Sequence, residues 1–199
     1  VAVLNDVLFD FAYDASHVAT VSLCVQPGLL VSARSKPLRS IDRLRASVRA
    51  GEVFRSPDEL LAHLLHLQAE VLVRIVRDST GRADAVEDGI LADRIQSSRA
   101  ELGKLRRVLV RLQRLLAPEP AALFRLLNRP PSWISEADRQ DLRESAEEFA
   151  TAIADGAALG ERVKLLQEEL AATLNEQTNR SLFILTVVTV LALPFNVIA

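Results

Sequence analysis

The sequence predicts an α/β protein, in which an N-terminal β-sheet with covering helices is followed by an antiparallel helix pair and a very long stalk helix that runs into a transmembrane segment. Three observations predict this fold. Residues 1–35 contain β-branched and alternating runs, residues 57–130 carry leucines at helical spacing, and residues 136–193 contain no proline. The chain then ends in an apolar run of a length that suits a bilayer better than a core.

Composition narrows the function. A quarter of the residues are charged, but the net charge is only −2, so no positive excess indicates a nucleic-acid partner. The single Cys24 cannot form an internal disulfide, which favours a reducing, cytoplasmic environment. The chain contains no Met, even at its start, so we expect a fragment of a longer protein. No arrangement of nucleophile and base and no Gly-rich phosphate loop indicates an enzyme, and no organic cofactor is expected.

Residues 1–56 are interpreted as the C-terminal part of an α/β sheet domain. Three runs with strand character are separated by turn signals, of which Pro27-Gly28 is the clearest. A helix is expected next, because Pro37 suits a first turn and Gly51 suits a stop. The apolar residues between them recur at helical spacing: Leu38, Ile41, Leu44 and Val48.

Residues 57–130 are expected to form an antiparallel helical hairpin. Ser56 can cap the first helix, with Pro57 at its first position and Glu59 completing a capping box. The second helix is expected at about residues 97–117, before Pro118 interrupts it. Its apolar residues form the seam that two antiparallel helices need in order to pack: Leu102, Leu105, Leu109, Leu112 and Leu116.

Residues 135–180 are expected to form the stalk helix, and residues 181–199 the start of a first transmembrane helix. The segment Ser135–Asp138 resembles a capping box and marks where the stalk begins. A continuous helix from residue 136 to residue 199 would be about 95 Å long, at ~1.5 Å per residue.

The run from Leu182 to Ala199 carries no charge, and its length is at the lower limit for a membrane span, which needs about 20 residues. A buried core helix is the alternative. Thr186, Thr189 and Asn196 lie close to one helical face, and polar side chains in membrane helices usually turn toward other helices or a watery path. Several copies around an axis would provide such a path. The alternative for the threonines is a hydrogen bond to their own helix.

Two stretches of the sequence are recognisable. "NEQTNRSLFILTVVTVLALP", at residues 175–194, resembles the stalk and first membrane helix of the CorA superfamily of divalent-cation transporters, and most closely its zinc-transporting ZntB branch. "VSLCVQPGLLVSARSKPLRSIDRLRASVRAGEVFRSPDELLAHLL", at residues 21–65, resembles the soluble domain of that family. The sequence ends before the family's Gly-Met-Asn signature, its ion-selecting loop and its second membrane helix.

The resemblance implies a bacterial inner-membrane transporter or channel, of which this portion is mainly cytoplasmic. Five protomers would form a funnel that gates a central pore lined by their first membrane helices. The transported ion would be Zn²⁺, or else Mg²⁺, Co²⁺ or Ni²⁺, since two pore positions depart from the Mg²⁺-type pattern. The matched pore-lining positions are Asn179, Leu182, Leu185, Thr189, Leu193 and Asn196.

Two further interpretations stay open. His63 and His66 are three residues apart on a predicted helix and could ligate Zn²⁺ together with a carboxylate such as Glu59 or Glu70; the alternative is two half-buried histidines at a packing edge. The alternative to transport is a membrane-anchored coiled-coil scaffold, which a dimer rather than a pentamer would indicate.

Overall fold

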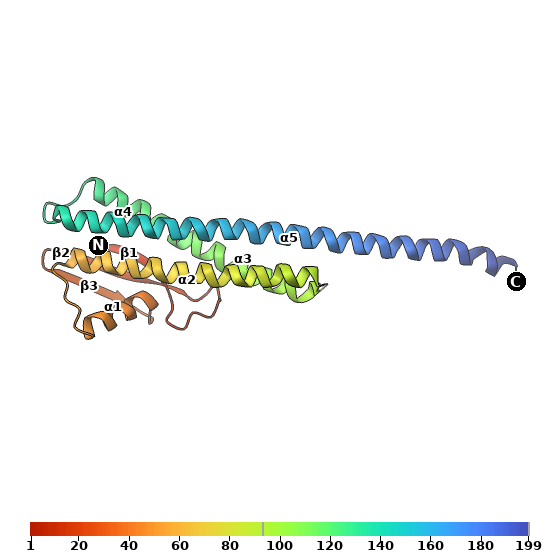
Figure 1. Cartoon of the computed structure of the whole chain (residues 1–199), viewed down its shortest axis with the longest axis horizontal. Helices are drawn as coiled ribbons and strands as arrows, with labels where there is room; N and C mark the ends of the chain where they lie inside the picture. The colour runs from red at the N-terminus through yellow and green to blue at the C-terminus, as the bar shows by residue number, and fades with distance from the viewer. Residues whose placement is uncertain (93, 199) are drawn as a thin grey trace.

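The computed structural model describes residues 1–92 and 94–198, and it describes no side chains at residue 96 or at residues 191–198. A small sheet comes first and helices follow. The last helix runs the whole length of the molecule and extends well beyond the other elements (Figure 1). In chain order the elements are β1 (Ala2–Val7), β2 (Val18–Gln26), β3 (Leu29–Arg34), α1 (Arg39–Arg49), α2 (Pro57–Leu91), α3 (Ile95–Leu116), α4 (Pro118–Asn128) and α5 (Glu136–Ile198).

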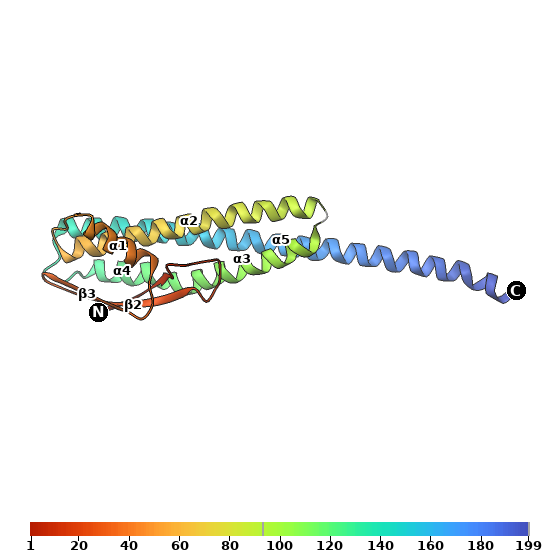
Figure 2. The same cartoon turned by 90° about the horizontal axis from the view of Figure 1, so that it is seen from below.

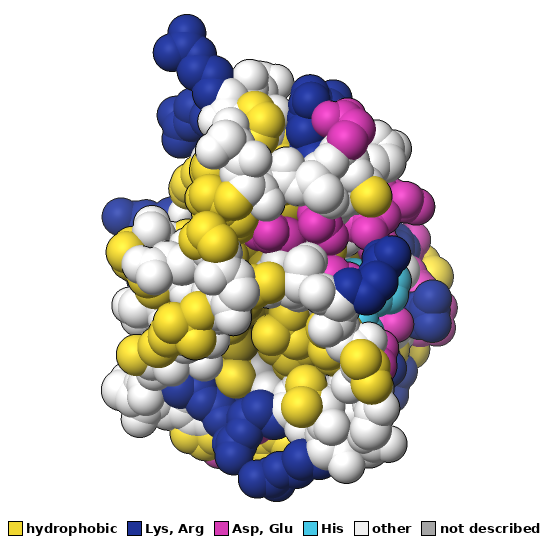
Figure 3. Space-filling model, turned by 90° about the vertical axis from the view of Figure 1, so that its left-hand side faces the viewer, with side chains coloured by type: hydrophobic (Ala, Val, Ile, Leu, Met, Phe, Trp, Pro, Cys, Tyr) yellow, Lys and Arg dark blue, Asp and Glu magenta, His cyan; other side chains and the backbone are white. Residues whose placement is uncertain are grey.

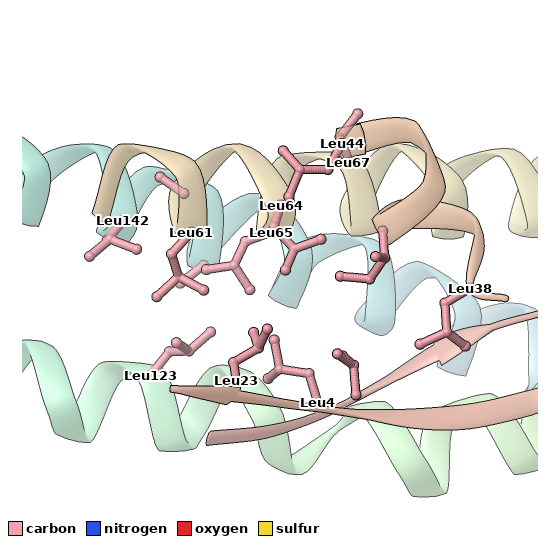
Figure 4. Packing of buried hydrophobic residues seen from close by; sticks show 14 of the residues in the cluster. Leu4, Leu23, Leu38, Leu44, Leu61, Leu64, Leu65, Leu67, Leu123 and Leu142 are labelled. Atoms are coloured by element: carbon pink, nitrogen blue, oxygen red, sulfur yellow. The ribbon is translucent and has the colours of Figure 1, made fainter. Parts of the chain in front are cut away.

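The three predicted strands form one antiparallel sheet in the order β1-β2-β3. The predicted turn joins β2 to β3, and Gly28 adopts a φ of 76° there, in the left-handed region that glycine tolerates best. One face of the sheet is buried. Figure 4 shows Leu4 and Leu23 pointing from the strands toward Leu61 of α2, so the sheet lies against the helices as one wall of the core.

Helix α1 begins with a cap that comes from another element. Leu38 occupies the N-cap position and has no polar side chain to offer. Asp6 on β1 replaces it, because its carboxylate accepts hydrogen bonds from the Ser40 backbone N–H (2.8 Å) and from the Ser40 hydroxyl (3.1 Å). Asp6 thus satisfies a donor of the first helical turn and ties α1 to the sheet. At the other end, Gly51 has a φ of 96°, as the predicted stop requires.

Helices α2, α3 and α5 lie side by side in both views and form an elongated three-helix bundle (Figures 1 and 2). The predicted hairpin is present as α2 and α3, and α2 continues through Gly81 and Gly89 to Leu91. The predicted leucine seam of α3 is buried, but it packs on α5 as well as on α2. Pro118 starts α4 directly after α3, and α4 packs against the first part of α5.

Helix α5 has 63 residues and is uninterrupted, as the sequence predicts. At ~1.5 Å per residue it is about 95 Å long. In its N-terminal part, buried apolar residues recur at helical spacing, and Phe149, Val163 and Leu170 face α2 and α3. Its C-terminal part extends past the α2–α3 turn, where no other described segment of the chain lies beside it (Figures 1 and 2). These features confirm the predicted fold class.

Candidate functional site

The exposed end of α5 is the first candidate site. All residues from 175 to 190 are exposed, although most of those after Arg180 are apolar. Leu182 and Leu185 are 55% and 63% exposed, whereas the leucines on the bundle-facing side of the same helix, such as Leu166 and Leu170, are 6% and 2% exposed. Such a surface is unfavourable in water, because each large apolar side chain left exposed forfeits about 1.5–3 kcal/mol of burial free energy. This end of α5 therefore requires contact with lipid or with other protein.

The structure places the predicted pore-lining residues on one continuous helix. At 3.6 residues per turn, Asn179, Leu182, Leu185 and Thr189 lie along one face of it. Leu193 and Asn196 continue that face by their spacing, but their side chains lie outside those described. The roles of all six residues stay predictions, because a single chain contains no pore.

Thr186 and Thr189 use the alternative that the sequence left open. The hydroxyl of Thr186 donates to the carbonyl oxygen of Leu182 (2.8 Å), and that of Thr189 donates to the carbonyl oxygen of Leu185 (2.8 Å). Each hydroxyl oxygen keeps acceptor capacity after donating its proton. The intrahelical bonds thus satisfy the hydroxyl protons and leave the oxygens available to a hydrated ion.

Within the part of the chain whose side chains are described, no helix is both long and apolar enough to span a bilayer. The predicted span ends in residues 191–199, which lie outside this set, so the predicted transmembrane segment remains a prediction.

The second candidate site is an open cavity of about 550 Å³ at the predicted histidine pair. His66 Nδ1 lies 2.7 Å from Glu148 Oε2 of α5, and its Nε2 lies 3.5 Å from Glu70 Oε1. His63 Nε2 lies 3.9 Å from Glu52 Oε2 and has no hydrogen-bond partner among the described residues. The two rings are 6.5 Å apart between centroids. The acidic residues that line the cavity are Glu52, Glu59, Asp141, Glu144 and Glu148.

Both predicted third ligands form ion pairs with arginines, although Glu70 also approaches His66. Glu59 forms an ion pair with Arg55 (3.0 Å), and Glu70 forms one with Arg43 (3.1 Å). No group of three or more His, Cys, Asp or Glu side chains in the described part of the chain is arranged to hold a metal ion. The geometry therefore favours the alternative of two histidines at a packing edge, and the metal site stays an unsupported prediction.

Sequence reasoning missed Glu148, the carboxylate closest to His66, and Glu52, the carboxylate closest to His63. Glu148 is separated from His66 by 82 residues along the chain, and Glu52 lies in the loop before α2. The acidic start of the stalk is visible in the sequence, but its register against α2 is set by the packing of Phe149 and Ala146, which no local pattern reveals.

Two curated proteins are similar in sequence to most of this chain. The chain is 26% identical over 168 residues to "Divalent cation transporter CmaX" of Pseudomonas aeruginosa, which covers 84% of this chain and 51% of CmaX. It is 22% identical over 178 residues to "Zinc transport protein ZntB" of Pectobacterium atrosepticum, covering 89% of this chain and 54% of ZntB. The chain thus spans about half the length of the curated relatives it matches.

Solved structures share the fold. The CorA magnesium transporter of Methanocaldococcus jannaschii superposes with a TM-score of 0.81 at 22% identity, covering 94% of this chain and 59% of that one. The ZntB cytoplasmic domain of Vibrio parahaemolyticus superposes with a TM-score of 0.73 at 15% identity, covering 87% and 68%. The family described as "CorA-like Mg2+ transporter protein" matches residues 2–199. The predicted resemblance to the CorA superfamily and its ZntB branch is confirmed, and this chain belongs to the CorA-like family.

Proposed function

We propose that this chain is the funnel-forming part of a divalent-cation transporter of the bacterial inner membrane, together with the start of its pore-lining helix. The observation that carries the proposal is the continuity of α5. One helix joins a buried position such as Phe149 to an exposed apolar end around Leu182 without a break. Membership of the CorA-like family and the CmaX and ZntB relatives support transport of divalent cations.

The proposed pore forms where five copies of α5 surround an axis. Leu182 and Leu185, and Leu193 further along, would form apolar rings that close the path by excluding water. Thr189 would place neutral oxygens between these rings, and Asn179 and Asn196 would place them before and after the rings. A divalent ion that sheds water reluctantly can pass such oxygens with part of its hydration shell retained. Neutral rings do not by themselves select Zn²⁺ over Mg²⁺, Co²⁺ or Ni²⁺.

The proposed gating follows from how α5 is held. Its buried part is fixed to α2 and α3, and Arg162 of α5 forms ion pairs with Asp84 (2.7 Å) and Glu87 (2.6 Å) of α2. A change in the packing of one bundle against its neighbour would therefore tilt or rotate the whole of α5. Because the apolar rings lie on that helix, such a motion changes their diameter.

The gate is tested by Leu182→Ala in the full-length protein, reconstituted in liposomes. Shortening the Leu182 ring widens the apolar constriction and weakens dewetting, so we expect basal ion flux to rise several-fold. Ile184→Ala is the matched control, since Ile184 is also exposed but lies on the opposite face of the helix. Unchanged flux in Leu182→Ala, or an equal rise in both variants, would contradict the assigned gate.

The scaffold alternative is tested by the number of subunits. Native mass spectrometry of the full-length protein in detergent should give five copies for the transporter. A dimer would favour the scaffold. The zinc assignment is tested separately, by measuring the flux of each ion in proteoliposomes of wild-type protein.

A further inference from the structure

A row of cations runs along the outward face of α3, opposite its buried leucines. Its members are exposed and follow one another at spacings of three and four residues, which keeps them on one side of the helix: Lys104, Arg107, Arg111 and Arg114. None of them forms an ion pair in the described part of the chain, although Asp14 lies near Arg107. Val110 lies at the edge of this row and is 51% exposed. We call these five residues the α3 basic stripe.

The outward face of α5 carries the opposite charge. Glu161, Leu165 and Glu168 follow one another at spacings of four and three residues, and all three are exposed. Leu165 is 62% exposed, although it lies inside the stretch of α5 that packs in the bundle. Glu161 forms an ion pair with Lys164 of the same helix (3.7 Å), whereas Glu168 forms none with the residues that the structure describes. We call Glu161, Leu165 and Glu168 the α5 acidic stripe.

The two stripes lie at the same level along the bundle but on different sides of it. Arg106, beside the α3 basic stripe, donates to the side-chain oxygen of Gln167, which precedes Glu168 (3.0 Å). The two helices lie side by side and run in opposite directions (Figures 1 and 2). Each turns its buried residues toward the shared core and its stripe away from that core. The α3 basic stripe of one copy therefore faces away from the α5 acidic stripe of the same copy.

We propose that the α3 basic stripe of one copy binds the α5 acidic stripe of the next copy around the axis of the funnel, an inference that rests on the proposed function. Complementary surfaces on different sides of one molecule make head-to-tail contacts, which form a ring where the rotation closes. Rotation about an axis parallel to α5 keeps all copies at one height, so stripes at equal level meet without a shift. Val110 then lies beside Leu165 of the next copy, between the opposite charges.

The other acidic surface of the molecule does not complement the α3 basic stripe in such a ring. It surrounds the histidine-lined cavity at the base of the bundle, where Figure 3 shows Asp, Glu and His side chains gathered on one flank. Its α5 residues Glu144 and Glu148 lie about 20–25 Å before Glu161 along the helix, at ~1.5 Å per residue. Charge complementarity mainly sets the register of a contact, and here it selects the α5 acidic stripe.

Disulfide trapping tests the contact in the full-length protein in membranes, with all native cysteines replaced by Ala. On mild oxidation, Val110→Cys combined with Leu165→Cys should give a ladder of linked chains up to five copies, because a disulfide requires Cα atoms within about 7 Å. Each single-cysteine variant should give no ladder, since a head-to-tail contact places different residues opposite each other. Val73→Cys combined with Leu165→Cys is the matched control and should give none, because Val73 is exposed on α2 (38%).

Charge reversal tests the recognition in the same cysteine pair. Arg107→Glu and Glu168→Arg should each slow ladder formation by about threefold to tenfold, because like charges then face one another. The two reversals together restore opposite charges and should return the rate to within about twofold of the parent. Arg74→Glu, at an exposed position of α2, should leave the rate unchanged. A loss that the combined reversal does not restore would overturn the pairing, and circular dichroism checks that every variant folds.

Native mass spectrometry of the wild-type protein separates this contact from the proposed function. Five copies, with no ladder from Val110→Cys combined with Leu165→Cys, would overturn the contact and leave the funnel standing. A dimer would contradict both. An equal ladder from the Val73→Cys control, or an equal loss of rate in Arg74→Glu, would overturn the contact alone.

Discussion

At the scale of single residues, buried carboxyls hold the sheet to the helices. Asp6 caps α1 from β1, and Glu119 of α4 accepts hydrogen bonds from the backbone N–H of Asn5 (2.6 Å) and from its side-chain amide (2.9 Å). Gln68 of α2 donates to the Asn5 carbonyl oxygen (3.0 Å). The Asn5 side-chain amide also donates to the Leu115 carbonyl oxygen of α3 (3.1 Å), so Asn5 of β1 is bonded to three helices.

These carboxyls make stability depend on pH. Burial raises the pKa of Asp6 to about 6 and that of Glu119 to about 7, and the nearby Asp6 carboxylate also contributes to the Glu119 shift. Both folded-state values lie above the unfolded ones, so the folded state binds these protons more tightly. The resulting stabilisation is fully present below about pH 4, falls as the pH rises, and is lost above about pH 7.

Glu119→Gln tests this dependence. The variant keeps an acceptor for Asn5 but cannot ionise, so its stability should fall less between about pH 5 and pH 8 than that of the wild type. The difference in slope should amount to about 1–3 kcal/mol over this range. Chemical denaturation followed by circular dichroism measures it. Glu161→Gln, at an exposed position, is the control, and a wild-type slope in Glu119→Gln would contradict the role of Glu119.

At the scale of elements, the helices that begin at Pro57 and Glu136 share one cap. The Ser56 hydroxyl accepts from the Glu59 backbone N–H (3.0 Å) and donates to Asp138 Oδ1 (3.0 Å). The Ser135 hydroxyl accepts from the Asp138 backbone N–H (3.1 Å) and donates to Asp138 Oδ2 (2.6 Å). Asp138 therefore links the N-termini of α2 and α5, which are the two longest helices.

A double-mutant cycle tests this link. Ser56→Ala and Ser135→Ala should each lower the free energy of unfolding by about 1 kcal/mol through loss of a cap. Because both hydroxyls donate to the same carboxylate, the double variant should depart from additivity by about 0.5 kcal/mol or more. The same cycle between Ser56→Ala and Ser145→Ala, whose hydroxyl bonds only within α5, should be additive. Additivity in both cycles would show that the shared cap carries no coupling.

The sequence predicts where these helices begin and end, but it does not predict the contacts between them. Capping residues such as Ser56 and Ser135 and the leucine spacing predict where α2, α3 and α5 lie, because such signals are local. Contacts across elements leave no local pattern. Glu119 accepts a hydrogen bond from Asn5, 114 positions away in the sequence, and Asp6 of β1 caps α1. The Glu148 partner of His66 was missed for the same reason, whereas the pore face was predicted from spacing and resemblance together.

At the scale of the whole molecule, α5 connects two environments. Its first part packs in a helix bundle in which leucines and some carboxyl groups are buried. Its last described side chains are exposed and mostly apolar. The sequence predicts this division, because charge ends at Arg180. It cannot reveal an assembly, since the contacts that would cover Leu182 and Leu185 are made by other molecules.

The central claim is that, in the exposed end of α5 after Arg180, the face with Leu185 borders water while the opposite face does not. Cysteine accessibility tests it most directly, in full-length protein in membranes and with Cys24 and any other native cysteine replaced by Ala. Under conditions in which ions are transported and the apolar rings are open, Leu185→Cys should react with a water-soluble, membrane-impermeant thiol reagent and the adduct should block ion flux, while Ile184→Cys should stay unreactive. Equal reactivity of the two positions, or an unreactive Leu185→Cys beside a reactive Ile184→Cys, would contradict the account.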